Sequence, residues 1–458
     1  MILQAPPQAG KLALTVGNVT VTFESMHTII PIRKLALLWV LTVAWLGSPA
    51  VAAPRHVYLT WQDDPARAIT VNYHTISSSS SSVATGSTVS QVLFDTVARG
   101  GMPSTYGGRA VGTRQAIAAV PGRSVHRVQL TGLLPERSYW FVAGDSLTGF
   151  SSERAFRTAP DGEEPLRFVA AGDMGVAEGS RRLQAVAADQ EPLFALLGGD
   201  LAYTDGDWDQ WPVWDRWLDN WQELMVTPAG YTVPIVSAIG NHEVSGGYGG
   251  APDNAPIYLS YLAQAGDRSY YLRQVGSRLV IFLLDSGHLA SHGGAQAQWL
   301  EQQMAAHAGV PVRLATYHVP LFPGFRLPST KYSKTGRRSW QPVFDRYGLT
   351  AAFENHDHVF KRTHPIRGDH IDPRGTLYLG DGSFGRGPRM TRGPRQVHLR
   401  RRWYLDRLES KGHIWRVDVA GDSVVFAAVD QRGRVFDRTA RRSPGRPTRT
   451  SGLYIWLP

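Results

Sequence analysis

Alternating apolar and polar positions dominate residues 55–158 and predict a series of short strands. The clearest alternations are HVYLTW (56–61), AITVNYHT (68–75), SVHRVQLTGL (124–133) and SYWFVAG (138–144). Between them lie a six-serine run at 77–82 and a glycine-rich stretch at 100–112, which we expect to form flexible loops. Several short strands within about 100 residues are typical of an all-β sandwich of the immunoglobulin-like kind.

The pattern changes after Pro165, where short apolar runs end in polar residues and alternate with helical segments. These runs are LRFVAAGD (166–173), FALLGGD (194–200), VPIVSAIGNHE (233–243), RLVIFLLD (278–285) and VRLATYH (312–318). The alternation predicts an α/β core, and residues 375–437 return to a strand pattern. Five tryptophans recur along one predicted helix, where we expect core packing rather than a substrate-lining wall. They are Trp208, Trp211, Trp214, Trp217 and Trp221.

Residues 32–53 have the order of features found in a secretory signal peptide. Arg33 and Lys34 precede an apolar run at 35–46, and Ala50-Val51-Ala52 supplies a small-residue cleavage pattern. A helix of that length rises about 18 Å, which is too short to span the roughly 30 Å hydrocarbon core of a bilayer. We therefore predict a leader over 1–53, with Met26 as the true start, and export to the periplasm or the cell exterior.

The length and amino-acid composition limit the number of domains and the kinds of functional site. The 458 residues suffice for two or three domains. The complete lack of cysteine excludes a disulfide scaffold, a thiolate metal site and a thiol nucleophile.

The formal charge of +10 is concentrated in residues 386–449, which hold 17 Lys and Arg against 6 Asp and Glu. This region could draw anionic substrates, contact an anionic envelope or form a solvated face, and we expect no specific nucleic-acid partner.

Eight polar residues stand at or just beyond the ends of the predicted strands. They are Asp173, Asp200, Tyr203, Asn241, His242, His318, His356 and His358. A single aspartate there is usually a turn residue, and a lone histidine is more often structural. Five such motifs in order instead predict a metal site, because open α/β sheets place their sites at the carboxyl ends of strands. The oxygen and nitrogen donors suit first-row metal ions.

These motifs resemble a known family. GDMG (172–175), GDLAY (199–203), GNHE (240–243), His318 and NHDH (355–358) resemble the five signature blocks of the calcineurin-like metallophosphoesterases. Most members have a histidine two residues after the first aspartate, whereas this chain has Gly175 there and offers Tyr203 instead. That exchange resembles the purple acid phosphatases, whose N-terminal fibronectin type III-like domain the VYLTW and VQLTGL strands also resemble.

The resemblance implies both architecture and ligands. It implies a fibronectin type III-like sandwich at 54–160, an α/β metallophosphoesterase domain at 161–440 with a two-sheet β core flanked by helices, and a basic tail at 441–458. Asp173, Tyr203 and His358 would hold one metal ion, and Asn241, His318 and His356 the other. Asp200 would bridge them. Fe(III) suits the first position, and Fe(II), Zn(II) or Mn(II) suits the second.

The resemblance also implies a reaction, the hydrolysis of phosphate monoesters by a metal-activated hydroxide. His242 would contact the phosphate or protonate the leaving oxygen, or else serve as a structural residue beside Asn241. Asn355 replaces the glycine that usually begins the last block, and we expect it to adopt a left-handed turn. Two alternatives remain open: a phosphodiesterase on the same site, and a cell-surface or polyanion-binding protein with a vestigial metal site.

Three further features of the sequence are weaker indications of function. Segment 319–353 lacks the extra histidines of the plant-type enzymes and offers basic residues, for which phosphate contacts and solvated loop charges are alternatives. They are Arg326, Lys331, Lys334, Arg337 and Arg338. His288 and His292 are expected to be loop residues, and a contact at the rim of the site is the alternative. The glycine-rich LGDGSFGRG (379–387) lacks the ending of a nucleotide P-loop.

Overall fold

The structure is a computed structural model, and contacts divide it into two compact units, Met1–Val51 and Ala52–Pro458. It describes residues 54–76, 89–117, 120, 122–147, 149–262, 264, 268–380, 382–393 and 396–442. In the first unit it describes β1 (Leu12–Val16) and β2 (Val19–Phe23), which pair antiparallel. The predicted signal peptide, Met26, the six-serine run and the tail beyond residue 442 lie outside the described residues.

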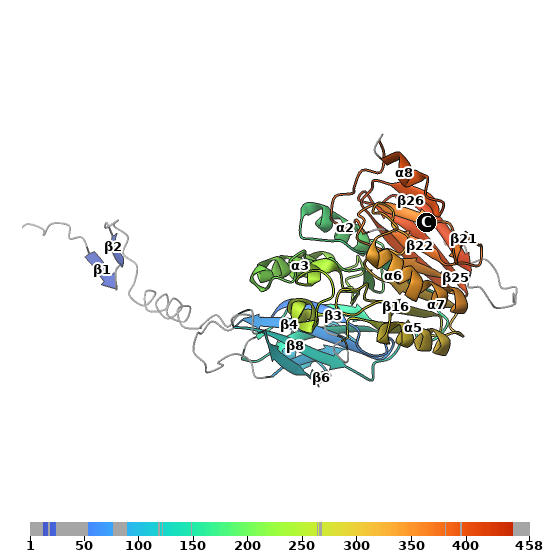
Figure 1. Cartoon of the computed structure of the whole chain (residues 1–458). Helices are drawn as coiled ribbons and strands as arrows, with labels where there is room; N and C mark the ends of the chain where they lie inside the picture. The colour runs from blue at the N-terminus through green and yellow to red at the C-terminus, as the bar shows by residue number, and fades with distance from the viewer. Residues whose placement is uncertain are drawn as a thin grey trace, which may run out of the picture. The chain divides into compact units, whose positions relative to one another are not determined.

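The second unit begins with the predicted β-sandwich, which is confirmed (Figure 1). One face is formed by β3 (Arg55–Thr60), β4 (Ile69–Ile76), β8 (Arg123–Leu130) and β7 (Thr113–Ala116). The other face is formed by β10 (Gly149–Phe150), β9 (Ser138–Asp145), β5 (Gln91–Asp95), β6 (Gly108–Val111) and β11 (Arg154–Arg157). Alternate side chains such as Val71, Val128 and Phe141 are fully buried between the faces.

The prediction of a flexible loop at 100–112 is wrong. This stretch contains a 3-10 helix at Pro103–Thr105 and the strand β6, which pairs antiparallel with β5. Its last glycine serves a close approach, because a Cβ on Gly112 would lie 1.8 Å from the carbonyl oxygen of Arg127. Glycine therefore allows the backbones to meet here, which composition alone does not distinguish from flexibility.

Two sheets form the core of the remaining chain, as the fold prediction expected. The first sheet orders β26 (Val435–Arg442), β25 (Ser423–Asp430), β24 (His413–Ala420), β12 (Leu166–Ala171), β13 (Ala195–Leu197) and β14 (Ile235–Ser237). Beyond β14 this sheet continues into β3 of the sandwich through the pair Ile235 and Thr60. The second sheet orders β15 (Tyr271–Val275), β16 (Leu279–Leu283), β17 (Val312–Thr316), β18 (Ala351–Phe353), β22 (Leu377–Gly380), β19 (Phe360–Thr363) and β23 (Leu405–Glu409).

The two sheets pack face to face, and helices cover their outer surfaces (Figure 1). Phe168 and Leu196 of the first sheet share one buried cluster with Leu314 of the second. The first outer face packs against α2 (Glu178–Ala188), α3 (Trp211–Leu224) and α4 (Pro256–Tyr261). The second packs against α5 (Ala295–Ala306), α6 (Lys331–Ser339) and α7 (Gln341–Tyr347). Short pieces complete the second unit: β20 (Ile366–Arg367), β21 (His370–Ile371) and α8 (Val397–Arg400).

The tryptophan-rich helix is α3, and core packing is confirmed for three of its rings. Trp214, Trp217 and Trp221 are fully buried against the first sheet, whereas Trp208 and Trp211 are half-buried at its N-terminal end. Among the described residues, every helix is too short or too polar to traverse a bilayer. Residues 52–458 form one compact unit, and the domain boundary at residue 160 stays a prediction.

Candidate metal centre

The candidate ligands lie in loops that leave the carboxyl ends of parallel strands. Asp173 follows β12 and Asp200 follows β13, and these strands are parallel neighbours. Asn241 follows β14, the next parallel strand of the same sheet. His318 and His356 follow β17 and β18, which are parallel neighbours in the second sheet. Both sheets therefore deliver polar side chains to a common edge, where their loops meet.

The backbone at this edge is unusual. Five candidate ligands have a left-handed backbone conformation with φ between 52° and 76°: Asp173, Asp200, Tyr203, His356 and His358. Each such residue costs of order 1 kcal/mol or more, so the surrounding contacts must hold it in place. One such contact is the backbone N–H of His356, which donates to Asp173 Oδ2 at 2.9 Å. Strain of this kind concentrates at functional sites.

The expectation for Asn355 is wrong, because Asn355 does not have a positive φ and the two histidines that follow do. Its side chain instead fills the space above two glycines. A Cβ on Gly198 would lie 1.8 Å from its Nδ2, and one on Gly172 would lie 2.4 Å from its Oδ1. Nδ2 also donates to the carbonyl oxygen of Tyr317 at 3.0 Å. Asn355 thus connects the loop of the last motif to β17 through its side chain.

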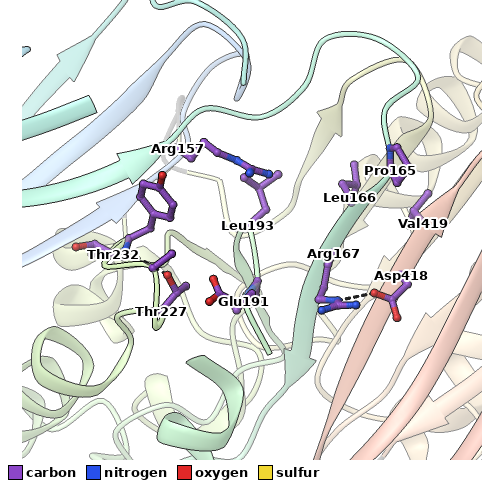
Figure 2. A pocket seen from close by; sticks show the side chains of 13 residues that line it. Arg157, Pro165, Leu166, Arg167, Glu191, Leu193, Thr227, Thr232, Asp418 and Val419 are labelled. Atoms are coloured by element: carbon purple, nitrogen blue, oxygen red, sulfur yellow. Dashed lines mark hydrogen bonds and ion pairs between the residues drawn. The ribbon is translucent and has the colours of Figure 1, made fainter. Parts of the chain in front are cut away.

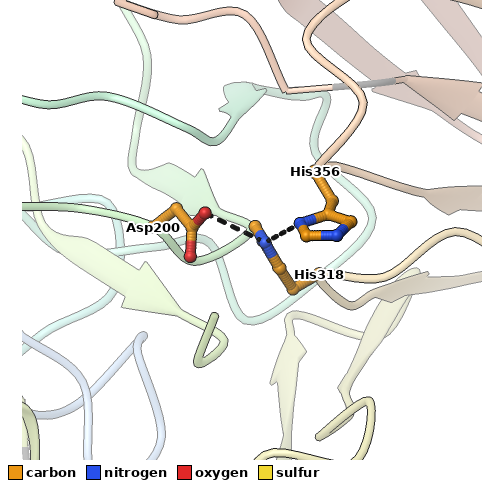
Figure 3. A group of neighbouring side chains, drawn as sticks. All are labelled: Asp200, His318 and His356. Carbon is orange, nitrogen blue, oxygen red and sulfur yellow. Dashed lines mark hydrogen bonds and ion pairs between the residues drawn. The ribbon is translucent and has the colours of Figure 1, made fainter. Parts of the chain in front are cut away.

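One group of ligand atoms surrounds Nε2 of His318 (Figure 3). This nitrogen lies 3.1 Å from Asp200 Oδ2, 3.1 Å from Asn241 Oδ1 and 3.0 Å from His356 Nδ1. Asp200, His318 and His356 are buried, and one ligand atom from each can lie within 4.8 Å of the others. These three side chains therefore form a compact set of metal-type donors.

A second group surrounds the hydroxyl of Tyr203. This oxygen lies 3.1 Å from Asp173 Oδ1 and 3.1 Å from His358 Nε2, and those two atoms lie 2.9 Å apart. The distances thus divide the candidate ligands into the two groups that the family resemblance implies. Their roles as ligands, and the bridging role of Asp200, stay predictions.

The hydrogen-bonding roles of the atoms in the first group suit the binding of a cation. The carbonyl oxygen of Gly198 can only accept, so His318 donates from Nδ1 across 3.0 Å, and in the neutral ring the lone pair of Nε2 then faces the group. The oxygens of Asp200 and Asn241 that face the same nitrogen also only accept. This corner holds more lone pairs than protons, which is the arrangement that a metal ion satisfies.

The electrostatics agree with this assignment. Burial acts to lower the pKa of His318, but the charges of Asp200 and Asp173 outweigh it and raise that pKa to about 9. Burial, together with the same two carboxylates, raises the pKa of Tyr203 well above its ordinary value. Both shifts describe a site with excess negative charge that attracts positive charge, whether a proton or a metal ion.

His242 lies beside the first group with its ring half-exposed. Nε2 is 3.8 Å from Asp200 Oδ2, and Nδ1 contacts the carboxylate of Asp205. Its ring centre is 4.3 Å from that of Tyr203. Asp205 was not among the predicted site residues, although an acidic residue two positions beyond the end of the second motif was a usable signal.

Glu243 was also missed as a positioning residue. Its buried carboxylate accepts three backbone hydrogen bonds: from Asp200 at 2.7 Å, Leu201 at 2.7 Å and Gly240 at 2.9 Å. Burial and the nearby charge of Asp200 raise the pKa of Glu243 to about 7. It joins the loops of the second and third motifs, and the glutamate that ends GNHE was the signal for it.

The glycine-rich loop after β22 closes the other side of the site. A Cβ on Gly382 would lie 1.6 Å from Asp173 Oδ2, so only glycine fits there. The backbone N–H groups of Gly385 and Arg386 both donate to the carbonyl oxygen of Asp173 at 3.1 Å. The loop is therefore part of the site without being a P-loop, and its role depends on contacts that the sequence did not reveal.

The remaining candidates lie around this centre. His288 and His292 lie in the loop between β16 and α5, as expected, and both are buried; the ring centre of His288 lies 5.6 Å from that of His318. Arg326 pairs with the buried carboxylate of Asp357 at 2.9 Å and is not a solvated loop charge. Arg337 donates to two backbone carbonyls, whereas Lys331, Lys334 and Arg338 are exposed.

A cavity of about 270 Å³ lies elsewhere (Figure 2). It is lined by residues at the starts of β12 and β13 and by the loop after α3, including Leu166, Glu191, Leu193 and Tyr231. Arg167 at its wall is already paired with Asp418 at 2.6 Å. None of the candidate ligands lines it, so it is separate from the metal centre.

Comparison with known proteins identifies the family. The family model "Purple acid Phosphatase, N-terminal domain" matches residues 54–158, and "Calcineurin-like phosphoesterase" matches residues 166–360. An uncharacterised protein of Mycobacterium tuberculosis is 28% identical over 286 residues, which cover 53% of this chain and 51% of the relative. Purple acid phosphatase 15 of Arabidopsis thaliana is 25% identical over 296 residues, covering 56% and 53%.

The solved structures agree on the fold. The purple acid phosphatase PPD1 of yellow lupin superposes with a TM-score of 0.68 at 17% identity, covering 87% of this chain and 78% of that one. This chain spans about half the length of the first curated relatives that it matches. Both family models match in the expected order, and the predicted fold class is confirmed. The chain is therefore a purple acid phosphatase-like member of the calcineurin-like metallophosphoesterases.

Proposed function

We propose that this protein is an exported, metal-dependent phosphatase that hydrolyses phosphate monoesters. The observation that carries the proposal is the convergence of metal-type donors from both sheets on one edge, with lone pairs outnumbering protons around His318. In the reaction, water adds to phosphorus and the phosphorus–oxygen bond of the ester breaks. The leaving oxygen takes up a proton, which yields an alcohol and inorganic phosphate.

The residues present fit a dinuclear metal centre of the kind that the family uses. Asp173, Tyr203 and His358 would hold one ion, and Asn241, His318 and His356 the other, with Asp200 shared. Carboxylate and phenolate oxygens favour Fe(III) at the first position, and the amide and imidazole set favours Fe(II), Zn(II) or Mn(II) at the second. When bound, such a pair lowers the pKa of water and neutralises charge on the phosphoryl oxygens.

His242 is suited to deliver the proton to the leaving oxygen. Asp205 contacts its Nδ1, which orients the ring and leaves Nε2 on the side of the ligand groups. A half-exposed general acid can be recharged from solvent between turnovers.

Two further features support the finer parts of the proposal. Positive side chains at the rim, including Arg386 over the Tyr203 ring, favour a doubly charged monoester over a singly charged diester. The charged, apolar and small-residue order of positions 32–53 supports export. The relatives of known type are named purple acid phosphatases, which supports the choice of reaction.

The test combines an ester panel with metal analysis. The loaded protein should contain about two metal ions per chain and hydrolyse an aryl phosphate monoester faster than the bis-ester. An Asp200→Asn variant should lose nearly all hydrolysis, whereas the matched control Asp369→Asn, at an exposed position, should retain it. Faster bis-ester hydrolysis would make the protein a phosphodiesterase. A folded protein that takes up no metal would favour the polyanion-binding alternative.

A further inference from the structure

The loop after β22 carries two arginines, Arg386 and Arg389, that stack on aromatic rings. Cζ of Arg386 lies 3.7 Å from the ring centre of Tyr203, and Cζ of Arg389 lies 5.3 Å from that of Phe325. Within the part of the chain that the structure describes, neither guanidinium forms an ion pair or donates a hydrogen bond. Nε of Arg389 is buried without a partner. The neighbouring Arg326 differs, because it is paired with a buried aspartate.

Backbone contacts hold both arginines at the site. The N–H of Arg386 donates to the carbonyl oxygen of Asp173 at 3.1 Å, and the N–H of Arg389 donates to that of His358 at 2.8 Å. Asp173 and His358 belong to the same predicted ligand group. The two arginines are therefore hydrogen-bonded through their backbone to two residues of one predicted ligand group.

Stacking on an aromatic ring leaves the donors of a guanidinium free. The contact uses the flat face of the group, whereas its N–H bonds lie in the plane and point outward. A half-buried cation without an anionic partner is costly, and a planar fork of donors matches phosphoryl oxygens. Arg386 is exposed to solvent beside the site and Arg389 is half-buried, so both side chains are at least partly accessible to a dissolved anion.

We propose that Arg386 and Arg389 form a subsite for a second phosphoryl group of the substrate. This inference rests on the proposed hydrolysis at the metal centre and specifies its substrate class: compounds in which another phosphate lies close to the scissile one. With inorganic pyrophosphate, water adds to one phosphorus and the P–O–P bond breaks. The second phosphate leaves from the arginine subsite and its oxygen takes up the proton that water gives up, so two orthophosphates form.

The test compares two substrates across matched variants. In the metal-loaded full chain, kcat/KM is measured for inorganic pyrophosphate and for an aryl phosphate monoester in the wild type, Arg386→Gln and Arg389→Gln. The ratio of the two values should fall about tenfold or more in each variant, mainly through KM for pyrophosphate. The control Arg438→Gln removes an equal charge from an exposed position on β26 and should leave the ratio unchanged.

Equal losses for both substrates, or the same loss in the control, would overturn the subsite in favour of general attraction by the basic segment. Arg386→Lys keeps the charge but not the planar fork, and it should recover only part of the ratio. If the wild type hydrolyses neither compound, the proposed function fails while the subsite can still be judged by calorimetry. Inorganic pyrophosphate should then bind the wild type at least about tenfold more tightly than orthophosphate, and Arg386→Gln should abolish that difference. Equal affinities would refute the subsite.

Discussion

A buried histidine in the sandwich should make the stability of this protein depend on pH. His126 on β8 is fully buried and stacks on Tyr73, with ring centres 4.4 Å apart. Its two nitrogens lie 2.8 Å from Ser90 Oγ and 2.9 Å from Thr75 Oγ1. Burial, and to a lesser degree the charge of Arg114, lowers the pKa of His126 to about 4. The ring is therefore neutral in the folded protein at neutral pH.

The direction of the pH dependence follows from the lowered pKa of His126. In the unfolded chain histidine titrates near 6.5, so between pH 6.5 and 4 the unfolded state binds a proton that the folded state does not. The contribution of His126 to stability is fully present above about pH 6.5 and is lost as the pH drops toward the pKa of the folded state. For a change from 6.5 to about 4, the contribution of His126 to the free energy of unfolding should be roughly 2 kcal/mol smaller at pH 5 than at pH 8.

The perturbation is His126→Phe, which keeps a ring against Tyr73 and removes the titration. At pH 8 the variant should be less stable by about 1–3 kcal/mol, because the hydroxyls of Ser90 and Thr75 lose their partner. At pH 5 that gap should shrink by roughly 2 kcal/mol, because only the wild type has a histidine that binds a proton in the unfolded state and not in the folded state. Urea unfolding followed by tryptophan fluorescence at both pH values measures the gap.

The difference between variant and wild type isolates this residue, since other titrating groups contribute equally to both. The matched control is His370→Gln, at an exposed position on β21, whose gap to the wild type should stay constant with pH. A His126→Phe gap that changes by less than about 0.5 kcal/mol between pH 8 and pH 5 would refute the reasoning.

Three further predictions concern the metal centre and the contact between α3 and the sandwich. Iron-loaded protein should show a visible charge-transfer band that disappears in Tyr203→Phe, and a persistent band would exclude Tyr203 as the ferric ligand. Gly198→Ala places a Cβ 1.8 Å from a neighbouring amide nitrogen and should weaken metal binding about tenfold or more by titration. Gly309→Ala, with open space around it, should not. Asp215→Ala leaves the buried Arg123 without its carboxylate, which lies 2.7 Å away, and should cost about 3–5 kcal/mol in urea unfolding; a loss under about 1 kcal/mol would contradict this.

Much of the site was predictable because its signals are local. A buried parallel strand is a short apolar run, and the residue after it must leave the sheet at the carboxyl edge. The positions of Asp173, Asp200 and His318 could therefore be placed at one edge before any contact was known. The lack of cysteine restricted the ligands to oxygen and nitrogen donors, and the donors at this edge satisfy that restriction.

Some local patterns were misleading because two physical causes produce the same composition. The glycines of 100–112 resembled a flexible loop, whereas Gly108 and Gly112 allow β6 and its neighbours to approach closely. Asn355 resembled a left-handed turn residue, whereas its side chain packs above Gly172 and Gly198. Close packing between distant segments decides between such causes, and a single sequence does not state which segments meet.

The sequence by itself determined the order of the elements, the ligand types and the edge of the sheet at which they gather. Only the tertiary structure decided which side chains support them. Asp205 orients His242, Glu243 joins two motifs, and Arg386 lies over Tyr203 from a loop far along the chain. The physical reason is that periodicity and turn chemistry act over a few residues, whereas these contacts form when the loops of two separate sheets pack together.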